Sequence, residues 1–334
     1  MKILYAVQGT GNGHISRSRS MAVELKNANI EVDYLFSGRE ESNYFDMEIF
    51  GNAIYKKGLT FVINNGKVDI WKTILHNDQT AFLRDIDHLD LSPYDLVISD
   101  YEPIAAWAAR LQNKPCIGIG HQYAFNHNIP VSHSNMVTRF IMKWFAPASF
   151  GIGLHWHHFN QPILPPIIDA LPPGITINNK IVVYLAFEDP AKVHEILSNF
   201  PGYTFHVYGG YGPRNTDHIW YKAPSRDGFK DDLLTCDGVL CNSGFELVSE
   251  ALTLGKKVLV NPVHGQMEQH SNALALKILN YGETMDTLDT KVIGNWLKKS
   301  TVTKIEYPNV AEFIVEWLQK DITKIPFMDC WRKI

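Results

Sequence analysis

One histidine stands where its side chain could move a proton. His14 ends a glycine-rich loop, residues 8–14, that follows the apolar run of residues 3–7. In an open α/β sheet, the carboxyl end of a strand is where ligands bind. An imidazole at that place can accept a proton from a hydroxyl near neutral pH. The alternative is a histidine that only hydrogen-bonds the backbone of its own loop.

A second polar turn follows an apolar run much later in the chain. Residues 239–241 are apolar, and Asn-Ser-Gly at 242–244 interrupts them before a helical pattern that ends at Gly255. Free N–H groups at a helix start, with the positive end of the helix dipole, suit a diphosphate. Residues 238–273 therefore predict a strand, a phosphate-sized turn, a helix, a second strand and a polar loop.

Two glutamates lie on the polar face of this predicted helix. Glu246 and Glu250 are four residues apart and so share one side of it. A carboxylate one or two turns into the helix can accept the hydrogens of a ribose diol. A purely local interpretation competes with this one, since Ser243 and Glu246 have the spacing of a capping box.

Further polar residues lie close to the first loop or follow strands of the same half. Arg17 and Arg19 fall early in the first helix, where cations oppose its dipole. They either face an anion or belong to a solvated face. Asp100 and His121 each directly follow a predicted strand, so they come to the same edge of the sheet. Asp100 is also placed to cap the helix after it.

Two parallel sheets are needed to bring these residues together. The sequence of strand, glycine-rich loop, helix and strand over residues 3–36 opens a Rossmann-like half, and the pattern restarts at residues 181–186. A nicotinamide cofactor normally meets an acid after the second strand, where Ser37-Gly38-Arg39 stands. Arg39 suits a 2′-phosphate, so NADP stays open at this loop. A P-loop is excluded because no Gly-Lys-Ser/Thr follows.

A proline-rich stretch separates the two halves. Residues 161–174 contain five prolines, which make a semi-rigid and poorly helical linker. This predicts an N-terminal domain over residues 1–160 and a second domain over residues 175–308. Asn309 can cap a final helix within residues 309–334, whose apolar residues are spaced three and four apart.

The composition narrows the class of protein. The chain has 334 residues, enough for two domains, and a net charge of −4. That charge gives no bulk attraction to nucleic acid or to an anionic membrane. Four cysteines without Cys-x-x-Cys spacing indicate neither a zinc site nor a disulfide framework. With no signal peptide and no apolar run near the roughly 20 residues of a spanning helix, we expect a cytoplasmic protein.

These features resemble the GT-B glycosyltransferases, and within them the bacterial peptidoglycan N-acetylglucosaminyltransferases and the UDP-glycosyltransferase superfamily. The resemblance is concentrated in residues 9–14 and 242–273. The matching elements of the second segment are Ser243-Gly244, Glu250-Ala251-Leu252, Leu254-Gly255, Pro262, Glu268-Gln269 and Asn272-Ala273. The resemblance implies an α/β fold of two Rossmann-like, parallel-sheet domains that face each other across a cleft. It also implies a terminal helix that returns to the N-terminal domain.

The resemblance further implies a set of donor-binding residues. They are Gly11, Gly13, Lys230, Ser243, Gly244, Glu250, Glu268 and Gln269. Ser243 and Gly244 would meet the diphosphate and Glu250 the ribose, while the backbone near Lys230 would read the base. Glu268 and Gln269 would bind sugar hydroxyls. Many relatives have Asp in place of Glu268, so the identity of the sugar does not carry over.

The catalytic residues follow from the same resemblance. In the superfamily, a histidine of the first loop is the catalytic base and an acid after a later strand orients it. His14 and Asp100 match these places. A carboxylate on one imidazole nitrogen fixes the tautomer and stabilises the imidazolium that forms. We assign Arg17 and His121 to the acceptor side.

Residues 135–146 predict an amphipathic helix with a wide apolar stripe. The stripe consists of Met136, Phe140, Ile141, Trp144 and Phe145. Arg139 and Lys143 lie beside it. The stripe either faces the core or makes a peripheral membrane contact for a lipid-borne acceptor, at the inner face of the membrane.

The expected function is the transfer of a sugar from a nucleotide sugar, most simply a UDP-sugar, to an acceptor hydroxyl. The helix start near Ser243 would stabilise the departing diphosphate, so neither a metal nor a cofactor is predicted. Attack opposite the leaving group would invert the anomeric centre. Two alternatives stay open: a sugar-nucleotide epimerase of the same fold, and a subunit that binds nucleotide sugars without catalysis. The acceptor, lipid-linked or glycan, is not defined.

Overall fold

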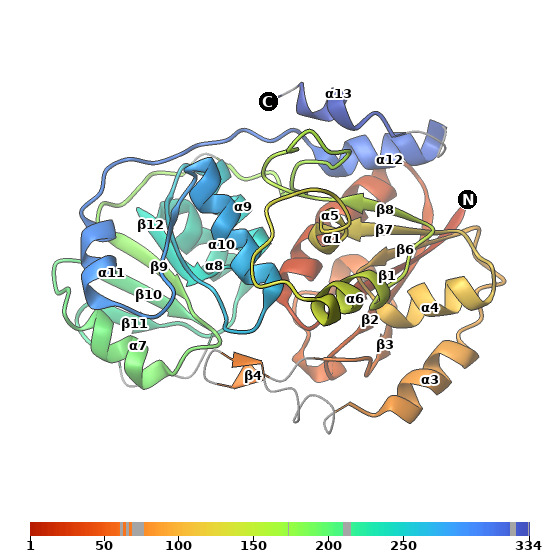
Figure 1. Cartoon of the computed structure of the whole chain (residues 1–334), viewed down its shortest axis with the longest axis horizontal. Coiled ribbons are helices and arrows are strands. Elements are labelled where there is room, and N and C mark those ends of the chain that lie inside the picture. The colour runs from red at the N-terminus through yellow and green to blue at the C-terminus, as the bar shows by residue number, and fades with distance from the viewer. Residues whose placement is uncertain are drawn as a thin grey trace.

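The chain folds around two separate parallel sheets of six strands each (Figure 1). The computed structural model describes residues 1–60, 63–64, 67–68, 77–172, 174–209, 215–320, 325–332 and 334. In Figure 1 the N-terminal half lies on the right and the C-terminal half on the left.

The N-terminal sheet has the strand order β3-β2-β1-β6-β7-β8, and every pairing is parallel. Its strands are β1 (Lys2–Gln8), β2 (Glu31–Ser37), β3 (Ile54–Lys56), β6 (Leu96–Asp100), β7 (Cys116–Gly120) and β8 (Phe150–Gly153). The order reverses between β1 and β6. This is the doubly wound arrangement in which ligands bind outside the carboxyl ends of the strands at the point of reversal.

The C-terminal sheet repeats the same order as β11-β10-β9-β12-β13-β14. Its strands are β9 (Lys180–Tyr184), β10 (Thr204–Tyr208), β11 (Ile219–Tyr221), β12 (Gly238–Asn242), β13 (Lys257–Asn261) and β14 (Glu283–Thr284). Here the reversal lies between β9 and β12. A small antiparallel pair, β4 (Ile63–Asn64) and β5 (Lys67–Val68), stands outside both sheets.

The central strands are buried on both faces because helices cover both sides of each sheet. All residues of β6, β7, β12 and β13 are buried, which explains their continuous apolar runs. The helices of the N-terminal half are α1 (Asn12–Asn27), α3 (Gln79–His88), α4 (Pro103–Leu111), α5 (His121–Ala124) and α6 (Met136–Trp144), with 3₁₀ turns η1 (Glu41–Asn43) and η2 (Glu48–Phe50). Those of the C-terminal half are α7 (Pro190–Leu197), α8 (Arg226–Thr235), α9 (Phe245–Thr253), α10 (Met267–Leu279) and α11 (Thr290–Leu297).

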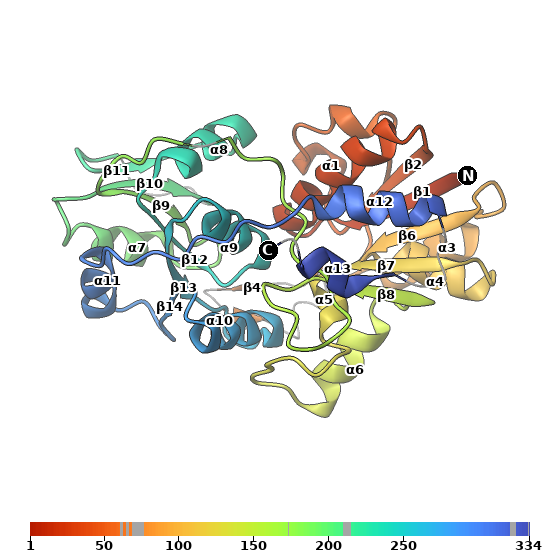
Figure 2. The ribbon, with the colours of Figure 1, turned by 90° about the horizontal axis from the view of Figure 1, so that it is seen from above.

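The end of the chain crosses back to the N-terminal half. Helix α12 (Val310–Lys320) packs against α1, as Figure 2 shows from above. Asn309 accepts a hydrogen bond from Glu312 N at 3.1 Å and donates to Glu24 of α1 at 2.8 Å. Helix α13 (Phe327–Trp331) follows, and Nε1 of its last residue, Trp331, donates a hydrogen bond to the carbonyl of Ile163 at 2.7 Å. The terminal segment thus fastens the two halves together.

The interpretation of the apolar stripe as a core-facing surface was wrong for its N-terminal part. Helix α6 has no buried residue, and Met136, Val137 and Phe140 are 88%, 66% and 64% exposed. The periodicity shows that the helix is amphipathic, but it does not show what lies opposite the apolar face. At the C-terminal end of the stripe, Trp144 stacks on Trp107 and Phe145 on Tyr101, whereas Met136, Val137 and Phe140 stay largely exposed.

Candidate active site

His14 and Asp100 meet at the point where the N-terminal sheet reverses. Their strands β1 and β6 are neighbours, so the loop after β1 and the last residue of β6 lie side by side. His14 Nδ1 is 2.6 Å from Asp100 Oδ1. Asp100 is fully buried, and the His14 side chain is 14% exposed. The histidine therefore bonds this carboxylate rather than the backbone of its own loop.

Asp100 does not cap the helix that follows it. Glu102 is the N-cap of α4, and its carboxylate accepts hydrogen bonds from Ile104 N at 2.9 Å and Ala105 N at 2.7 Å. The capping interpretation of Asp100 was therefore wrong, because the chain supplies a second acid two residues later. Asp100 is left free to face His14.

Arg17 neutralises the buried carboxylate of Asp100. Its Nε lies 2.6 Å from Asp100 Oδ2, and its Nη2 donates to Asp100 Oδ1. Burial alone would raise the pKa of Asp100, but the Arg17 guanidinium, and after it His14, hold that pKa below its ordinary value. The arginine is itself only 2% exposed, so the solvated-face alternative was wrong for Arg17.

Arg17 also contacts the other half of the molecule. Its Nη1 donates to Glu246 Oε1 at the start of α9. The anions that Arg17 faces are therefore two carboxylates of the chain itself. Arg19 is also buried, and it donates to the carbonyls of Phe45 and Asp46.

The start of α9 carries no capping side chain. Its N-cap is Gly244, and a Cβ built on that glycine would meet no atom within 4 Å. The Oγ of Ser243 is buried with no hydrogen-bond partner. The capping box of Ser243 and Glu246 does not form: the N-cap is Gly244 rather than Ser243, and Glu246 pairs with Arg17. Free N–H groups, open space and an unpaired hydroxyl thus come together at one helix start.

Helix α10 holds this turn in place. Gln269 Oε1 accepts from Ser243 N at 3.1 Å and from Val263 N at 2.9 Å, while Asn272 Nδ2 donates to Ser243 O at 2.9 Å. The side-chain oxygen of Gln269 therefore accepts hydrogen bonds from the protein itself. Asn272 was not predicted as a site residue, although the Gln-x-x-Asn spacing on one face of α10 points to a shared partner.

Two further donor-side acids lie at the junction between the halves. Glu250 Oε1 accepts from Ser16 Oγ at 3.3 Å, and Glu268 Oε2 accepts from Gln122 Nε2 at 3.0 Å. Burial raises the pKa of Glu250 to about 7, and the nearby carboxylates of Asp169 and Glu246 add to the rise. Lys230 lies 3.8 Å from Asp169, close enough to oppose that rise.

His121 does not face open space. It is fully buried, with Nδ1 2.8 Å from Leu154 O and Nε2 2.6 Å from Asn272 Oδ1. Its ring stacks on Phe245 of α9 at 4.1 Å between centroids. The structure thus places this predicted acceptor-side residue inside the contact between the halves. One nitrogen of His121 bonds Leu154 of its own half, and the other bonds Asn272 of the C-terminal half, a partner that the sequence does not reveal.

The loop glycines differ in their surroundings. Gly11 is the N-cap of α1, which also lacks a capping side chain, and a Cβ there would meet nothing within 4 Å. At Gly13 a Cβ would lie 3.3 Å from Glu246 Cβ and Oε2. Gly11 therefore borders free space, whereas Gly13 allows the two halves to approach.

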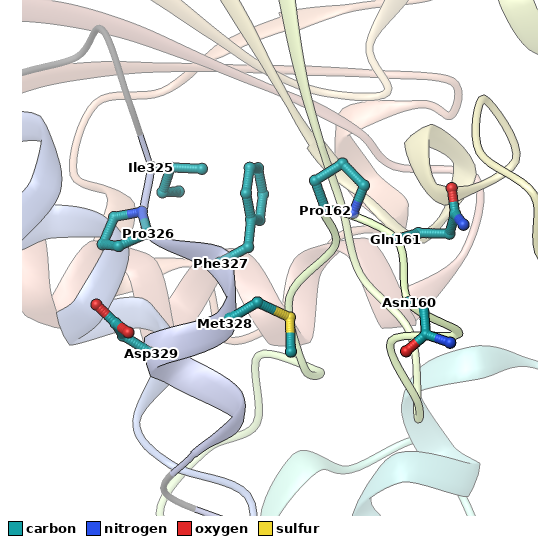
Figure 3. A pocket seen from close by; sticks show the side chains of 8 residues that line it. All are labelled: Asn160, Gln161, Pro162, Ile325, Pro326, Phe327, Met328 and Asp329. Atoms are coloured by element: carbon teal, nitrogen blue, oxygen red, sulfur yellow. The ribbon is translucent and has the colours of Figure 1, made fainter.

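A separate hollow lies between the linker and the chain end. Figure 3 shows this cavity of about 540 Å³. Its lining residues are Asn160, Gln161, Pro162, Ile325, Pro326, Phe327, Met328 and Asp329. None of the predicted site residues belongs to it. Within the described part of the chain, no three His, Cys, Asp or Glu side chains are grouped as a metal site would require.

Two Rossmann-like halves of identical strand order, with the predicted residues gathered where they meet, define a glycosyltransferase of the GT-B fold. The chain belongs to glycosyl transferase family 1, whose sequence model matches residues 1–300. The fold and the enzyme class expected from the sequence are thereby confirmed.

Relatives agree with this assignment. The chain is 27% identical to an uncharacterized glycosyltransferase of Methanosarcina acetivorans, over 86% of this chain and 84% of that protein. UGT89C1 of Arabidopsis thaliana, solved with quercetin, has a TM-score of 0.61 at 11% identity, covering 100% of this chain and 98% of that one. MurG of Acinetobacter baumannii has a TM-score of 0.56 at 14% identity, covering 96% and 99%. At these identities the solved structures support the fold alone.

Proposed function

We propose that the protein transfers a sugar from a UDP-sugar to an acceptor hydroxyl with inversion at the anomeric carbon. The acceptor oxygen attacks that carbon, and its proton passes to Nε2 of His14. The bond between the anomeric carbon and the diphosphate breaks, and its electron pair leaves with UDP. The products are the glycoside, UDP and the proton held by His14.

The observation that carries this proposal is the 2.6 Å contact between His14 Nδ1 and the buried Asp100 carboxylate. If Nδ1–H donates to Asp100, the lone pair of the ring is on Nε2, where it can accept a proton. Nε2 has no hydrogen-bond partner among the described residues. A carboxylate whose pKa is lowered stays ionised and stabilises the imidazolium.

The start of α9 supports a diphosphate-leaving group. The free N–H groups after Gly244 and the unpaired Oγ of Ser243 can donate to phosphate oxygens, and the helix dipole favours their charge. The proposed transfer therefore uses neither a metal nor a cofactor. In this proposal Glu250, further along α9, accepts hydrogens from the ribose, and Glu268 binds the sugar.

A ligand-binding panel tests the donor assignment. We expect the melting temperature of the protein to rise with UDP and with one UDP-sugar, because a ligand that binds the native state stabilises it by mass action. The panel includes other nucleotide sugars, NAD and NADP. A rise in melting temperature with NADP alone would contradict the proposal and would indicate that the first loop binds a dinucleotide.

The exposed stripe of α6 supports a peripheral membrane contact for a lipid-linked acceptor. Met136, Val137 and Phe140 project from the surface, with Arg139 and Lys143 exposed beside them. Apolar side chains flanked by cations can insert at the surface of an anionic bilayer, where the cations lie near the lipid headgroups. No helix in the described part of the chain is long and apolar enough to cross a membrane.

Sedimentation with vesicles of phosphatidylglycerol and phosphatidylcholine tests this contact. We expect the wild type to pellet with the vesicles and the double variant Met136→Ser/Phe140→Ser to lose at least half of that binding. Leu83→Ser is the matched control, since Leu83 is 64% exposed, as Phe140 is, but belongs to α3 rather than α6. Equal pelleting of all three proteins would rule out α6 as the contact.

A further inference from the structure

The guanidinium of Arg17 joins side chains of both halves. Towards the N-terminal sheet it donates through Nε and Nη2 to the two oxygens of Asp100. Towards the C-terminal half it donates through Nη1 to Glu246. The Arg17 side chain is 1% exposed, so these charge-assisted hydrogen bonds are shielded from solvent.

This arrangement restricts the orientation of His14. Arg17 Nη2 is only 2.7 Å from His14 Nδ1, yet a guanidinium can only donate. The short separation follows if Nη2–H and Nδ1–H both point to the same oxygen, Asp100 Oδ1. Because Arg17 occupies Oδ2 and one side of Oδ1, a single direction remains for the imidazole. The proton of His14 is then fixed on Nδ1.

Glu246 brings the C-terminal half into this group. It lies in the first turn of α9, directly after the proposed diphosphate turn. Its carboxylate pairs with Arg17 and takes no part in a capping box. Gly13 leaves the space that it enters. Two carboxylates against one guanidinium leave one negative charge, which an imidazolium would neutralise. Tyr5, from β1, also faces Asp100, but burial raises the pKa of its hydroxyl well above the ordinary value, so it stays neutral.

We propose that Arg17 is a positioning residue that couples the seating of the donor-binding half to the alignment of His14 and Asp100, with Glu246 as the contact that completes it. The inference rests on the proposed function, in which His14 is the base. Arg17 acts through Asp100, and Glu246 acts through Arg17. When Glu246 is withdrawn, the guanidinium loses its third anchor and Asp100 loses its fixed orientation.

Glu246→Gln tests this coupling, because it keeps the size of the side chain and one acceptor oxygen but removes the charge. Protein labelled with ¹⁵N-histidine is studied without ligand at about pH 8, above the ordinary range of imidazole. The His14 signals are assigned by their loss in His14→Gln. We expect a single Nδ1–H tautomer in the wild type and an average of both tautomers in Glu246→Gln. Glu250→Gln, on the same helix, should leave the His14 signals unchanged.

Kinetics supply a second readout. The substrate is the UDP-sugar that the ligand panel identifies, and the release of UDP is measured. We expect kcat of Glu246→Gln to be about 10- to 100-fold lower than that of the wild type, because a small misplacement of a catalytic group has effects of this size. The Kd for UDP should change by less than about twofold. Arg17→Lys keeps the charge but not the fork, and should lose activity to a similar extent.

The outcomes separate this inference from the proposed function. If His14→Ala is inactive but Glu246→Gln keeps the wild-type tautomer and kcat, the coupling is wrong and the base assignment stands. A wild-type His14 protonated on Nε2 would also overturn the coupling. If His14→Ala retains transfer, the proposed function itself fails.

Discussion

The two halves of the molecule treat equivalent helix starts in opposite ways. In the N-terminal half, α1 follows the central strand and begins at Gly11 without a capping side chain, while α4 is capped by Glu102. In the C-terminal half, α7 occupies the place of α1 and is capped by Asp189. Helix α9 occupies the place of α4 and begins at Gly244 without a cap.

Of these four helices, the two that begin without a capping side chain, α1 and α9, contact each other across the junction of the halves. Most helices close their first N–H groups with a side chain, as α3, α6 and α8 also do. In each half, therefore, one of the two equivalent helices begins without a capping side chain: α1 in the N-terminal half and α9 in the C-terminal half. The proposed donor and base lie where the caps are missing.

The largest effect should come from giving α9 the cap that its counterpart has. Gly244→Asp places a carboxylate where α4 has Glu102, and such an N-cap stabilises by roughly a few tenths of a kcal/mol relative to glycine. The same carboxylate should occupy the diphosphate turn and repel it, which lowers UDP affinity about 100-fold or more. Calorimetric titration with UDP and a thermal melt measure the two effects. Gly244→Asn separates occupancy from charge, and Gly202→Val controls for substitution at an open glycine elsewhere.

The converse change should affect stability alone. Glu102→Ala removes the cap of α4 and leaves Ile104 N and Ala105 N without their acceptor, while Ser37 Oγ keeps only its 3.3 Å contact with Gln8 Oε1. We expect the free energy of unfolding to fall by about 3 kcal/mol, since buried donors lose their partners. UDP binding to the folded protein should be unchanged. Weaker UDP binding would mean that α4 also serves the ligand, and the contrast between the helix starts would collapse.

A smaller effect is expected at the unpaired hydroxyl. Ser243→Ala removes a buried Oγ that has no partner, so the melting temperature should not fall. The Kd for UDP should rise about 10-fold if that hydroxyl donates to phosphate. Ser249→Ala is the matched control on the same helix, because Ser249 Oγ accepts from Trp156 Nε1 at 2.8 Å. That variant should lower stability and leave UDP binding alone.

The smallest effect concerns pH. Burial raises the pKa of Glu250 to about 7 in the folded protein, above its value in the unfolded chain. The stability that this group contributes is present below the unfolded pKa and is lost as pH rises through about 7. Glu250→Gln should therefore melt at the same temperature as the wild type in acid and at a higher temperature above neutrality. A difference between the two proteins that does not vary with pH would contradict the shift.

Local features were predictable and contacts between the halves were not. Strand, glycine-rich loop and helix can be inferred from residues 3–36, and the meeting of His14 with Asp100 follows from neighbouring parallel strands. The partner of Glu246 is Arg17, 229 positions away, so the local capping box was the natural but wrong alternative. His121 directly follows β7 as predicted, but Phe245 from the other half stacks on its ring and it is buried.

The same limit explains the apolar stripe of α6. Periodicity alone defines an apolar face, and only the packed structure shows that Met136, Val137 and Phe140 on it are largely exposed. The hydrogen bonds of Gln269 and Asn272 to Ser243 could not be predicted from the sequence either. They form only because α10 folds back against the turn at Ser243.

The most direct test of the account is the activity of His14→Ala beside its affinity for UDP. The account predicts that UDP release in the presence of acceptor falls about 10²- to 10⁴-fold, because the general base is gone. It also predicts that UDP raises the melting temperature as much as in the wild type, since the diphosphate turn of α9 is intact. Retained transfer in this variant would contradict the assignment of His14 as the base.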